Sequence, residues 1–239
     1  MHRFANPSRF LRAANAVLPW CAGLTVLLLA AGLYFALLGS PPDYQQGESV
    51  RIMYIHVPSA WMALFVYGCM AAASAAALIW RHPLADLIAK SAAPIGAGFT
   101  LICLLTGSLW GKPMWGAWWV WDARLTSVLV LFFLYLGYIA LVNAFDDPVR
   151  GYRAAGILAL VGVVNLPIIK FSVDWWNTLH QPASVMRLDG PAIHPAMLWP
   201  LLLMAAGFTL FFVTVLILRV RGEIAAAKVR NLQLSLAQG

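Results

Sequence analysis

Long apolar stretches alternate with short polar segments along the chain, and six of these stretches contain no Asp, Glu, Lys or Arg. A helix needs about 20 apolar residues to cross a bilayer core of about 30 Å. Five of the stretches are that long, and tilting, bilayer thinning and snorkelling of flanking cations would let the sixth span. The stretches are Ala13–Pro42, Ile52–Trp80, Ser91–Gly111, Leu125–Phe145, Ala154–Ile169 and Gly190–Leu218.

These unbroken apolar runs predict membrane-spanning helices, because the strands of a membrane barrel would alternate apolar and polar positions. We therefore predict an all-α integral membrane protein that forms a single polytopic domain over residues 1–239. The predicted spans cover about residues 18–39, 57–80, 90–110, 125–145, 154–170 and 195–218.

The overall composition agrees with this pattern and excludes two other classes of protein. The 239 residues are 62% hydrophobic and 10% charged, whereas soluble domains carry about 25% charged residues. A soluble globular enzyme is therefore excluded. A disordered chain would be poor in aromatic and apolar residues, so it is excluded as well.

The basic residues predict the orientation of the six spans. Both termini and the second and fourth loops share one side of the membrane, which holds eleven Lys and Arg residues, and the other side holds five. The positive-inside rule then places both termini in the cytoplasm, and the net charge of +7 needs no nucleic-acid partner. The eleven are Arg3, Arg9, Arg12, Arg81, Lys90, Arg150, Arg153, Arg219, Arg221, Lys228 and Arg230; the five are Arg51, Lys112, Arg124, Lys170 and Arg187.

The cysteines and the short loops limit the chemistry that the chain itself could perform. Cys21, Cys69 and Cys103 lie inside predicted spans, and the sequence has no C-x-x-C motif for thiol redox chemistry or covalent c-type haem attachment. We interpret them as packing residues. The sequence also lacks a phosphate-binding G-x-x-x-x-G-K-[ST] motif, so any ATP hydrolysis would belong to a partner.

The third loop, Trp110–Arg124, is rich in tryptophan and contains five of the eleven tryptophans in the chain. One interpretation is an aromatic belt at the membrane interface, where indoles are enriched. A belt, however, distributes its tryptophans over many helix ends. The clustering here, with Gly111, Pro113 and Gly116 shaping the backbone, favours a rigid aromatic platform for a large, flat, apolar ligand.

Two histidines are predicted on the same side of the membrane as this loop. His56 precedes the second span and His180 lies in the fifth loop. If residues 174–180 are helical, Trp176 and His180 share a face. A structural role at the interface remains the alternative to metal ligation for both. His194 is a third candidate without an aromatic cluster, whereas His2 and His82 lie on the cytoplasmic side.

Haem matches this combination of side chains. Its porphyrin is flat and apolar, and its iron accepts axial imidazoles, so His56 and His180 could ligate it from opposite faces. Trp115, Trp119 and Trp121 could stack on the ring or line its edge.

The propionates of haem require cations, and three arginines lie on the outer side. Arg51, Arg124 and Arg187 could pair with the propionates, or they could equally anchor the chain to lipid headgroups. Asp122 also has two interpretations: it could cap the helix that begins near Leu125, or it could orient the loop.

The segment Trp115-Gly116-x-x-Trp119-x-Trp121-Asp122-x-Arg124-Leu125-Thr126 resembles the WWD motif of haem-handling membrane proteins. With six spans, His56 before span two and Trp175-Trp176-Asn177-Thr178-Leu179-His180 before span six, the chain resembles the CcmC family (haem exporter protein C) of bacterial cytochrome c maturation. The resemblance extends from the first span to the last.

This resemblance implies that the chain binds b-type haem non-covalently at the periplasmic face of the bacterial inner membrane and presents it to the haem chaperone CcmE. CcmD and the ABC-type subunits CcmA and CcmB would be partners, with ATP hydrolysis in CcmA, so the chain itself would not be an enzyme. His56 and His180 would ligate the iron. The WWD segment, residues 110–126 in the third, periplasmic loop, would hold the ring with Trp115, Gly116, Trp119, Trp121, Asp122 and Arg124.

Other functions remain to be weighed against haem presentation. An ABC-type permease subunit would usually place ionisable residues or broken helices at mid-membrane, but the charges here lie at span edges. An electron-transfer cytochrome would need paired histidines deep inside spans, whereas His56 and His180 lie at outer ends. A cytochrome c synthetase would be an enzyme, and such WWD relatives are generally larger.

Overall fold

The computed structural model describes residues 6–182 and 184–237. These residues form helices joined by loops and turns, and no β-strand occurs among them. His2 and Arg3, which the sequence assigned to the cytoplasmic side, lie outside the described residues. The α-helices are α1 (Pro7–Tyr34), α2 (Met53–Trp80), α3 (Pro83–Trp115), α4 (Ala123–Asn143), α5 (Pro148–Gly162), α6 (Asn165–Trp175) and α7 (Pro195–Ala237). A short π-helix, η1 (Phe35–Gly39), continues α1, and a 3₁₀-helix, η2 (Glu48–Ile52), leads into α2.

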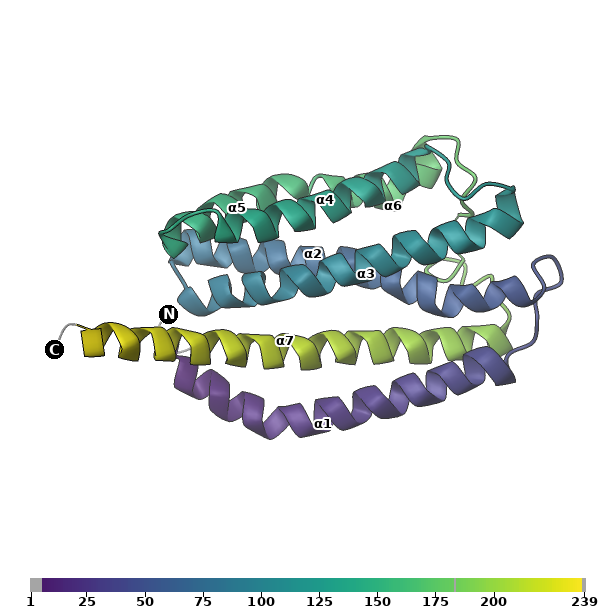
Figure 1. Ribbon diagram of the computed structural model, residues 1–239. Coiled ribbons are helices and arrows are strands. Elements are labelled where there is room, and N and C mark those ends of the chain that lie inside the picture. Colours follow the sequence, from purple (N-terminus) through teal and green to yellow (C-terminus); the bar gives the residue numbers. More distant parts are fainter. Residues whose placement is uncertain (1–5, 183, 238–239) are drawn as a thin grey trace.

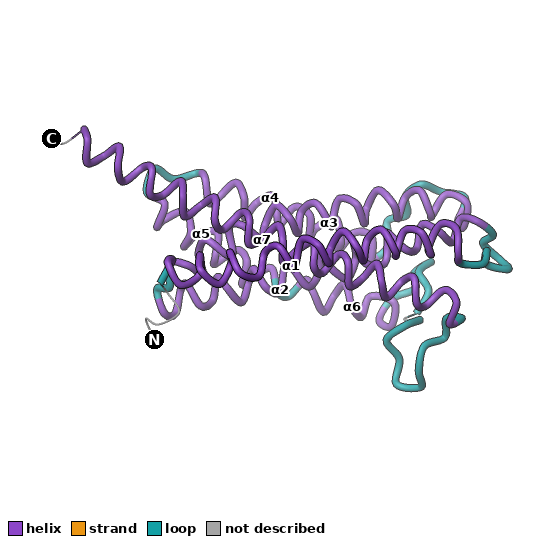
Figure 2. Tube along the Cα trace, turned by 90° about the horizontal axis from the view of Figure 1, so that it is seen from below, coloured by secondary structure: helices purple, strands orange, loops and turns teal. Residues whose placement is uncertain are grey.

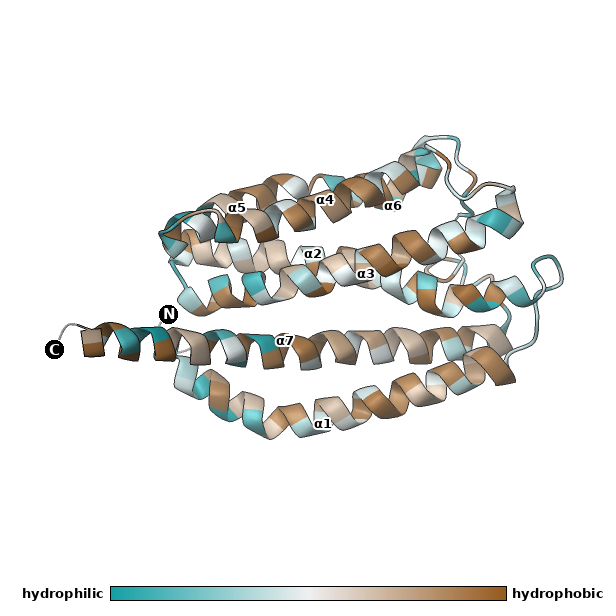
Figure 3. Cartoon of the chain, viewed as in Figure 1, coloured by the Kyte–Doolittle hydropathy of each residue, from teal (hydrophilic) through white to brown (hydrophobic). Residues whose placement is uncertain are grey.

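Six helical segments of the described chain are long and apolar enough to cross a membrane, with α5 and α6 acting together as one. The prediction of an all-α protein with six spans is therefore confirmed. Apolar residues run along the middle of the bundle, and polar residues gather toward its ends (Figure 3).

The helices form three layers that run roughly parallel to one another (Figure 1). One outer layer holds α1 and α7, the middle layer holds α2 and α3, and the other outer layer holds α4, α5 and α6, with contacts between neighbouring layers. Both termini lie at one end of the bundle, and the longer loops gather at the opposite end (Figures 1 and 2). The predicted arrangement of the loops is therefore present, and the end with the longer loops is called the outer end below.

Most helices run past the spans that the sequence predicted. The third extends to Trp115 instead of 110, the fifth segment covers Pro148–Trp175 instead of 154–170, and the last extends to Ala237 instead of 218. Charge-free runs underestimate helix length because Lys and Arg remain helical at the interface while their long side chains reach water. The fifth segment therefore has 28 residues, and tilt or thinning is not needed for it to span.

The core lies between α2, α3, α4 and α5 and is built from aromatic rings packed on small residues. The rings of Tyr67 and Tyr135 meet edge to face with centroids 5.1 Å apart. The Tyr135 hydroxyl donates to the Ala63 carbonyl at 2.8 Å, and its ring lies so close to Gly96 that a Cβ there would overlap it. At the break between α5 and α6, the buried Asn165 amide donates to the Ser127 carbonyl at 2.8 Å. This packing holds the helix ends that carry the candidate site.

Candidate functional site

The tryptophan-rich segment is part helix and part loop. Trp110 and Trp115 belong to the last turns of α3, which ends where Gly116 adopts φ +75°, a left-handed conformation that favours glycine. The Gly116 N–H donates to the Lys112 carbonyl at 3.0 Å and closes the helix. The interpretation of residues 110–115 as loop is therefore wrong, and only residues 116–122 connect α3 to α4.

Asp122 both caps α4 and holds His180. Its Oδ1 accepts the Leu125 N–H at 2.7 Å, as an N-cap side chain does. Its Oδ2 lies 3.1 Å from Nδ1 of His180. The first contact agrees with the capping interpretation, whereas the contact with His180 is one that the sequence did not predict. The Asp122 side chain is only 6% exposed.

His180 lies in the irregular segment between α6 and α7. Helix α6 ends at Trp175, and Trp176 is extended, so the condition under which Trp176 and His180 would share a helical face is not met. The His180 N–H instead donates to Thr178 Oγ1 at 2.9 Å. Its imidazole meets the Trp115 ring edge to face, with centroids 4.8 Å apart.

The protonation states of this pair follow from burial and hydrogen bonding. Burial lowers the pKa of His180, and the neighbouring Asp122 carboxylate only partly opposes this effect. Burial also acts to raise the pKa of Asp122, but hydrogen bonds from the Leu125 backbone, Thr178 and His180 outweigh it and lower that pKa. A neutral imidazole therefore donates its Nδ1–H to an ionised carboxylate, and Nε2 keeps its lone pair.

His56 has the same arrangement with different partners. It lies near the start of α2, and its Nδ1 is 3.1 Å from both the Cys103 carbonyl and Thr106 Oγ1 on α3. Because the carbonyl can only accept, Nδ1 carries the proton and Nε2 has the free lone pair. The imidazole meets the Trp110 ring edge to face at 5.6 Å between centroids.

The fold brings the two histidines to one neighbourhood at the outer end of the bundle. Their side chains interact electrostatically with each other, and Arg124 acts on both. Each imidazole has its Nδ1 occupied within the chain and lies against one tryptophan of α3. The pair therefore presents two Nε2 atoms in matching surroundings.

The remaining tryptophans of the segment differ in exposure. The rings of Trp119 and Trp121 meet edge to face at 5.5 Å, and Nε1 of Trp119 is buried without a hydrogen-bond acceptor in the described chain. Trp121 is 74% exposed and Trp118 is 56% exposed, with the Lys112 ammonium over the Trp118 ring. A buried donor of this kind usually finds an acceptor, so Trp119 has hydrogen-bonding capacity for a ligand.

The three arginines proposed to pair with propionates all have partners in the chain. Arg124 donates from Nε to Ser172 Oγ at 3.1 Å and also contacts carbonyls near the end of α6. Arg51 donates to the Ala36 carbonyl at 2.8 Å and forms an ion pair with Glu48. Arg187 forms an ion pair with Asp189. Each guanidinium thus stabilises local structure, and Arg124 in particular ties α4 to α6.

The other histidines of the described chain act at helix starts. His194 Nδ1 accepts the Ala196 N–H at 3.2 Å where α7 begins, and His82 Nδ1 accepts the Ala85 N–H at 3.3 Å where α3 begins. The structure thereby gives His194, the third outer-side candidate, a capping role.

Several residues that shape the site were missed by sequence reasoning. Cys103 contributes its carbonyl rather than its thiol, Thr106 reaches His56, and Gln46 accepts the Trp110 Nε1–H at 2.9 Å. These contacts depend on how α2, α3 and the first outer loop pair in space, which no local pattern indicates. Thr178 was also missed, although a hydroxyl two residues before His180 is a recognisable local motif that could have indicated it.

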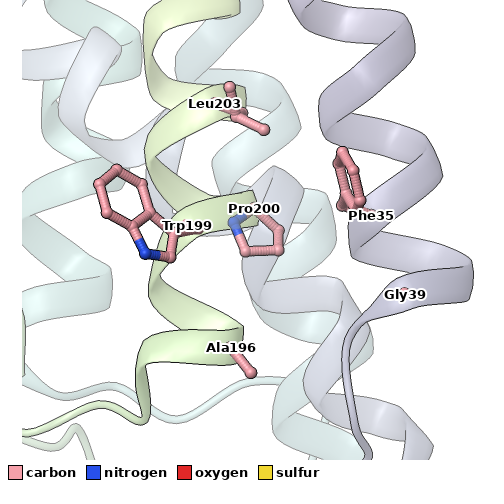
Figure 4. A pocket seen from close by; sticks show the side chains of 6 residues that line it. All are labelled: Phe35, Gly39, Ala196, Trp199, Pro200 and Leu203. Carbon is pink, nitrogen blue, oxygen red and sulfur yellow. The ribbon is translucent and has the colours of Figure 1, made fainter.

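An apolar groove of about 280 Å³ lies elsewhere, between the end of α1 and the start of α7 (Figure 4). Phe35 and Gly39 line one side of it, and Trp199, Pro200 and Leu203 line the other with Ala196. None of these belongs to the set of predicted site residues.

The two histidine Nε2 atoms at the outer end suit an iron ion that is already bound by a porphyrin ring. The described residues contain no group of three or more His, Cys, Asp or Glu side chains placed to hold a bare metal ion. Haem supplies four nitrogens to its iron and needs only axial ligands, which two Nε2 atoms can provide. The residues present therefore fit haem.

Comparison with known proteins gives a consistent result. The sequence model of one protein family, described as CcmC, Heme exporter protein C, matches residues 1–235. The chain is 62% identical over 230 residues to Heme exporter protein C of Bradyrhizobium diazoefficiens, covering 96% of this chain and 87% of that protein. It is 50% identical to proteins of the same name from Haemophilus influenzae, over 94% of this chain and 91% of that protein, and Escherichia coli, over 97% and 93%.

Proposed function

Because the chain belongs to the CcmC family of haem exporter protein C and has the family's role in haem export and cytochrome c biogenesis, we propose that it binds haem between His56 and His180. The haem is cargo, bound non-covalently as b-type haem at the outer end of the bundle. This end faces the periplasm and both termini lie in the cytoplasm, in a bacterial inner membrane, as the distribution of basic residues favours.

The observation that carries this proposal is the matched state of the two imidazoles. Nδ1 of His56 bonds to the Cys103 carbonyl, Nδ1 of His180 bonds to Asp122, and both Nε2 atoms keep lone pairs. Metal-ligating histidines generally donate their other N–H to a carbonyl or carboxylate in this way. Bound haem supplies the iron that accepts these two lone pairs.

The WWD segment would then hold the ring and meet the partner. Trp115 and Trp119, which are half-buried, would contact the porphyrin, and the buried Nε1–H of Trp119 would donate to an acceptor on it. The exposed ring of Trp121 offers an apolar surface to an incoming protein. Gly116 sets the turn at the end of α3 that presents these rings, and Arg124 braces the start of α4, where the loop ends, against α6.

We assign the receiving partner as the haem chaperone CcmE. CcmD, CcmA and CcmB would be the other subunits, with ATP hydrolysis in CcmA. The chain would then transfer haem without itself being an enzyme. These assignments rest on membership of the CcmC family, because haem exporter protein C works within a Ccm system of several subunits.

The test is a visible absorption spectrum of the purified, haem-loaded protein and of its single-histidine variants. We expect a six-coordinate spectrum for the wild type and altered ligation in His56→Ala and in His180→Ala. The matched control is His194→Ala, which removes an outer-side histidine placed at a helix start. An unchanged spectrum in both ligand variants would refute the assignment of these ligands.

A second experiment tests whether the protein transfers its haem to the chaperone. Mixing the loaded protein with purified CcmE is expected to move haem to the chaperone, and Trp119→Ala with Trp121→Ala is expected to slow this transfer while the protein remains in the membrane. Equal transfer by the variant and the wild type would exclude a role for these rings in docking.

A further inference from the structure

We infer that Asp122 is the positioning residue of His180 and makes this histidine the stronger of the two iron ligands, an inference that rests on the proposed haem-binding function. The two imidazoles resemble each other at Nε2 but differ at Nδ1. His180 donates to a carboxylate, whereas His56 donates to a neutral carbonyl. Each Nδ1 also lies near a threonine hydroxyl, so the hydroxyls do not distinguish the two imidazoles. The ligands are therefore chemically unequal.

The position of the Asp122 carboxylate is determined by the helix that it caps. One oxygen accepts the Leu125 N–H at 2.7 Å, and the other lies 3.1 Å from His180 Nδ1. The side chain is 6% exposed, so water cannot easily replace either partner. The start of α4 thus orients an imidazole whose own segment contributes only a longer contact, from Thr178 Oγ1 to Nδ1 at 3.4 Å.

The carboxylate also determines which nitrogen of His180 carries the proton. An ionised carboxylate has only acceptors, so it requires the proton on Nδ1 and leaves Nε2 for the metal. Charge-assisted hydrogen bonds are roughly twice as strong as neutral ones, and a carboxylate partner raises the basicity of a ligating histidine. His180 should therefore donate more electron density to iron than His56 does, and it should favour the ferric state.

The nearby guanidinium of Arg124 does not distinguish the two imidazoles. Arg124 interacts electrostatically with His56 and with His180 alike, so its effect is shared by both imidazoles. Asp122 contacts His180 directly. The inequality of the ligands is therefore assigned to this one carboxylate.

The experiment replaces the charge of Asp122 while retaining the helix cap. In Asp122→Asn, the amide oxygen can still accept the Leu125 N–H, but the amide N–H₂ then faces Nδ1 of His180 and favours the wrong tautomer. We expect haem affinity to fall about 10- to 100-fold, as for other partners of metal-ligating histidines. We also expect the reduction potential of the remaining bound haem to become more positive.

Two further variants separate this role from capping. Asp147 caps α5 by accepting the Val149 N–H at 2.9 Å and is exposed, so Asp147→Asn is the matched control and should leave affinity and potential unchanged. Asp122→Ser keeps a capping hydroxyl that cannot reach His180, and it should lose haem as Asp122→Asn does. Thermal unfolding of each haem-free variant establishes that it folds.

Double variants test whether Asp122 acts through His180. Asp122→Asn should have no further effect on haem affinity in a His180→Ala background, whereas it should keep its full effect in a His56→Ala background. Equal losses in both backgrounds, or equal potentials for Asp122→Asn and Asp147→Asn, would overturn the inference while haem binding itself stood. If the wild-type protein took up no haem, the proposed function would fail first, and this inference with it.

Discussion

The two histidine-bearing regions of the outer end are built in opposite ways. His56 belongs to α2, whose long packed interface with α3 places the Cys103 carbonyl and Thr106 against the imidazole. His180 belongs to the irregular segment 176–182 after α6, where it donates hydrogen bonds to single side chains, those of Asp122 and Thr178. One imidazole is positioned by the packing of two helices, and the other by polar contacts that can be removed one at a time.

This difference indicates where each region should be sensitive to substitution. A helix-borne ligand fails when the helices are forced apart, because close packing leaves little space for added volume. A loop-borne ligand fails when its hydrogen bonds are removed, because the backbone of the loop does not restrain it. The following variants address one region at a time.

The largest effect is expected from Gly107→Leu, which adds volume beside His56. A Cβ at Gly107 would lie 3.0 Å from Cε1 of the imidazole, closer than ordinary packing allows. The larger side chain should displace His56 from Cys103 and Thr106, at a cost of about 1–3 kcal/mol in the free energy of unfolding. Denaturant unfolding of the haem-free protein and the axial ligation of the loaded protein measure both consequences.

The control for this variant is Gly98→Leu on the same helix. A Cβ at Gly98 meets nothing within 4 Å, so the same substitution adds side-chain volume in open space. This variant should retain the wild-type stability and spectrum. If Gly98→Leu were as damaging as Gly107→Leu, the helix-borne region would be sensitive to any large side chain rather than to contact with His56.

A smaller effect is expected from Thr178→Ala in the loop-borne region. Thr178 Oγ1 accepts the His180 N–H at 2.9 Å, and its hydroxyl also bonds to Asp122. Its loss should cost about 1 kcal/mol, the usual net value of one hydrogen bond, and should weaken haem binding by less than the loss of Asp122. Calorimetric titration with haem measures the change.

Thr178→Ser retains the hydroxyl and should restore wild-type affinity. Thr178→Ala should also leave the contacts of His56 intact, because those contacts come from α3. A variant in which both imidazoles lost iron ligation would show that the two regions are not independently held, and would remove the distinction drawn above.

The difference between the regions also explains how much the sequence could predict. The six spans and the common location of His56, the WWD segment and His180 follow from apolar run lengths and from counting membrane crossings. The end of α3 did not follow, because a run of tryptophans beside glycine and proline indicates loop although Trp110 and Trp115 are helical. Gly116 was the better local signal, because glycine commonly ends a helix in the left-handed conformation that Gly116 adopts here.

The partners of the imidazoles were the least predictable part of the site. Asp122 and His180 are 58 positions apart, and His56 and Cys103 are 47 apart. Such pairs depend on the rotation of each helix and on the course of the loops. The local capping pattern at Leu125 indicated one function of Asp122, whereas its second function required knowledge of where the α6–α7 segment returns.

The smallest expected effect concerns the pH dependence of folding of the haem-free protein. The folded-state pKa of His180 is lowered, mainly by burial, so the unfolded chain binds a proton at higher pH than the folded one. Stability is then fully present above the ordinary histidine value of about 6.5 and is lost as the pH falls below it.

Hydrogen bonds lower the folded-state pKa of Asp122 despite its burial, so this carboxylate adds a second loss below its own ordinary value of about 3.9. The melting temperature should therefore begin to fall as the pH decreases through 6.5, and His180→Ala should make this first decrease smaller while keeping the one at lower pH. An identical acid dependence in His180→Ala would mean that the loop-borne imidazole is not held neutral against Asp122.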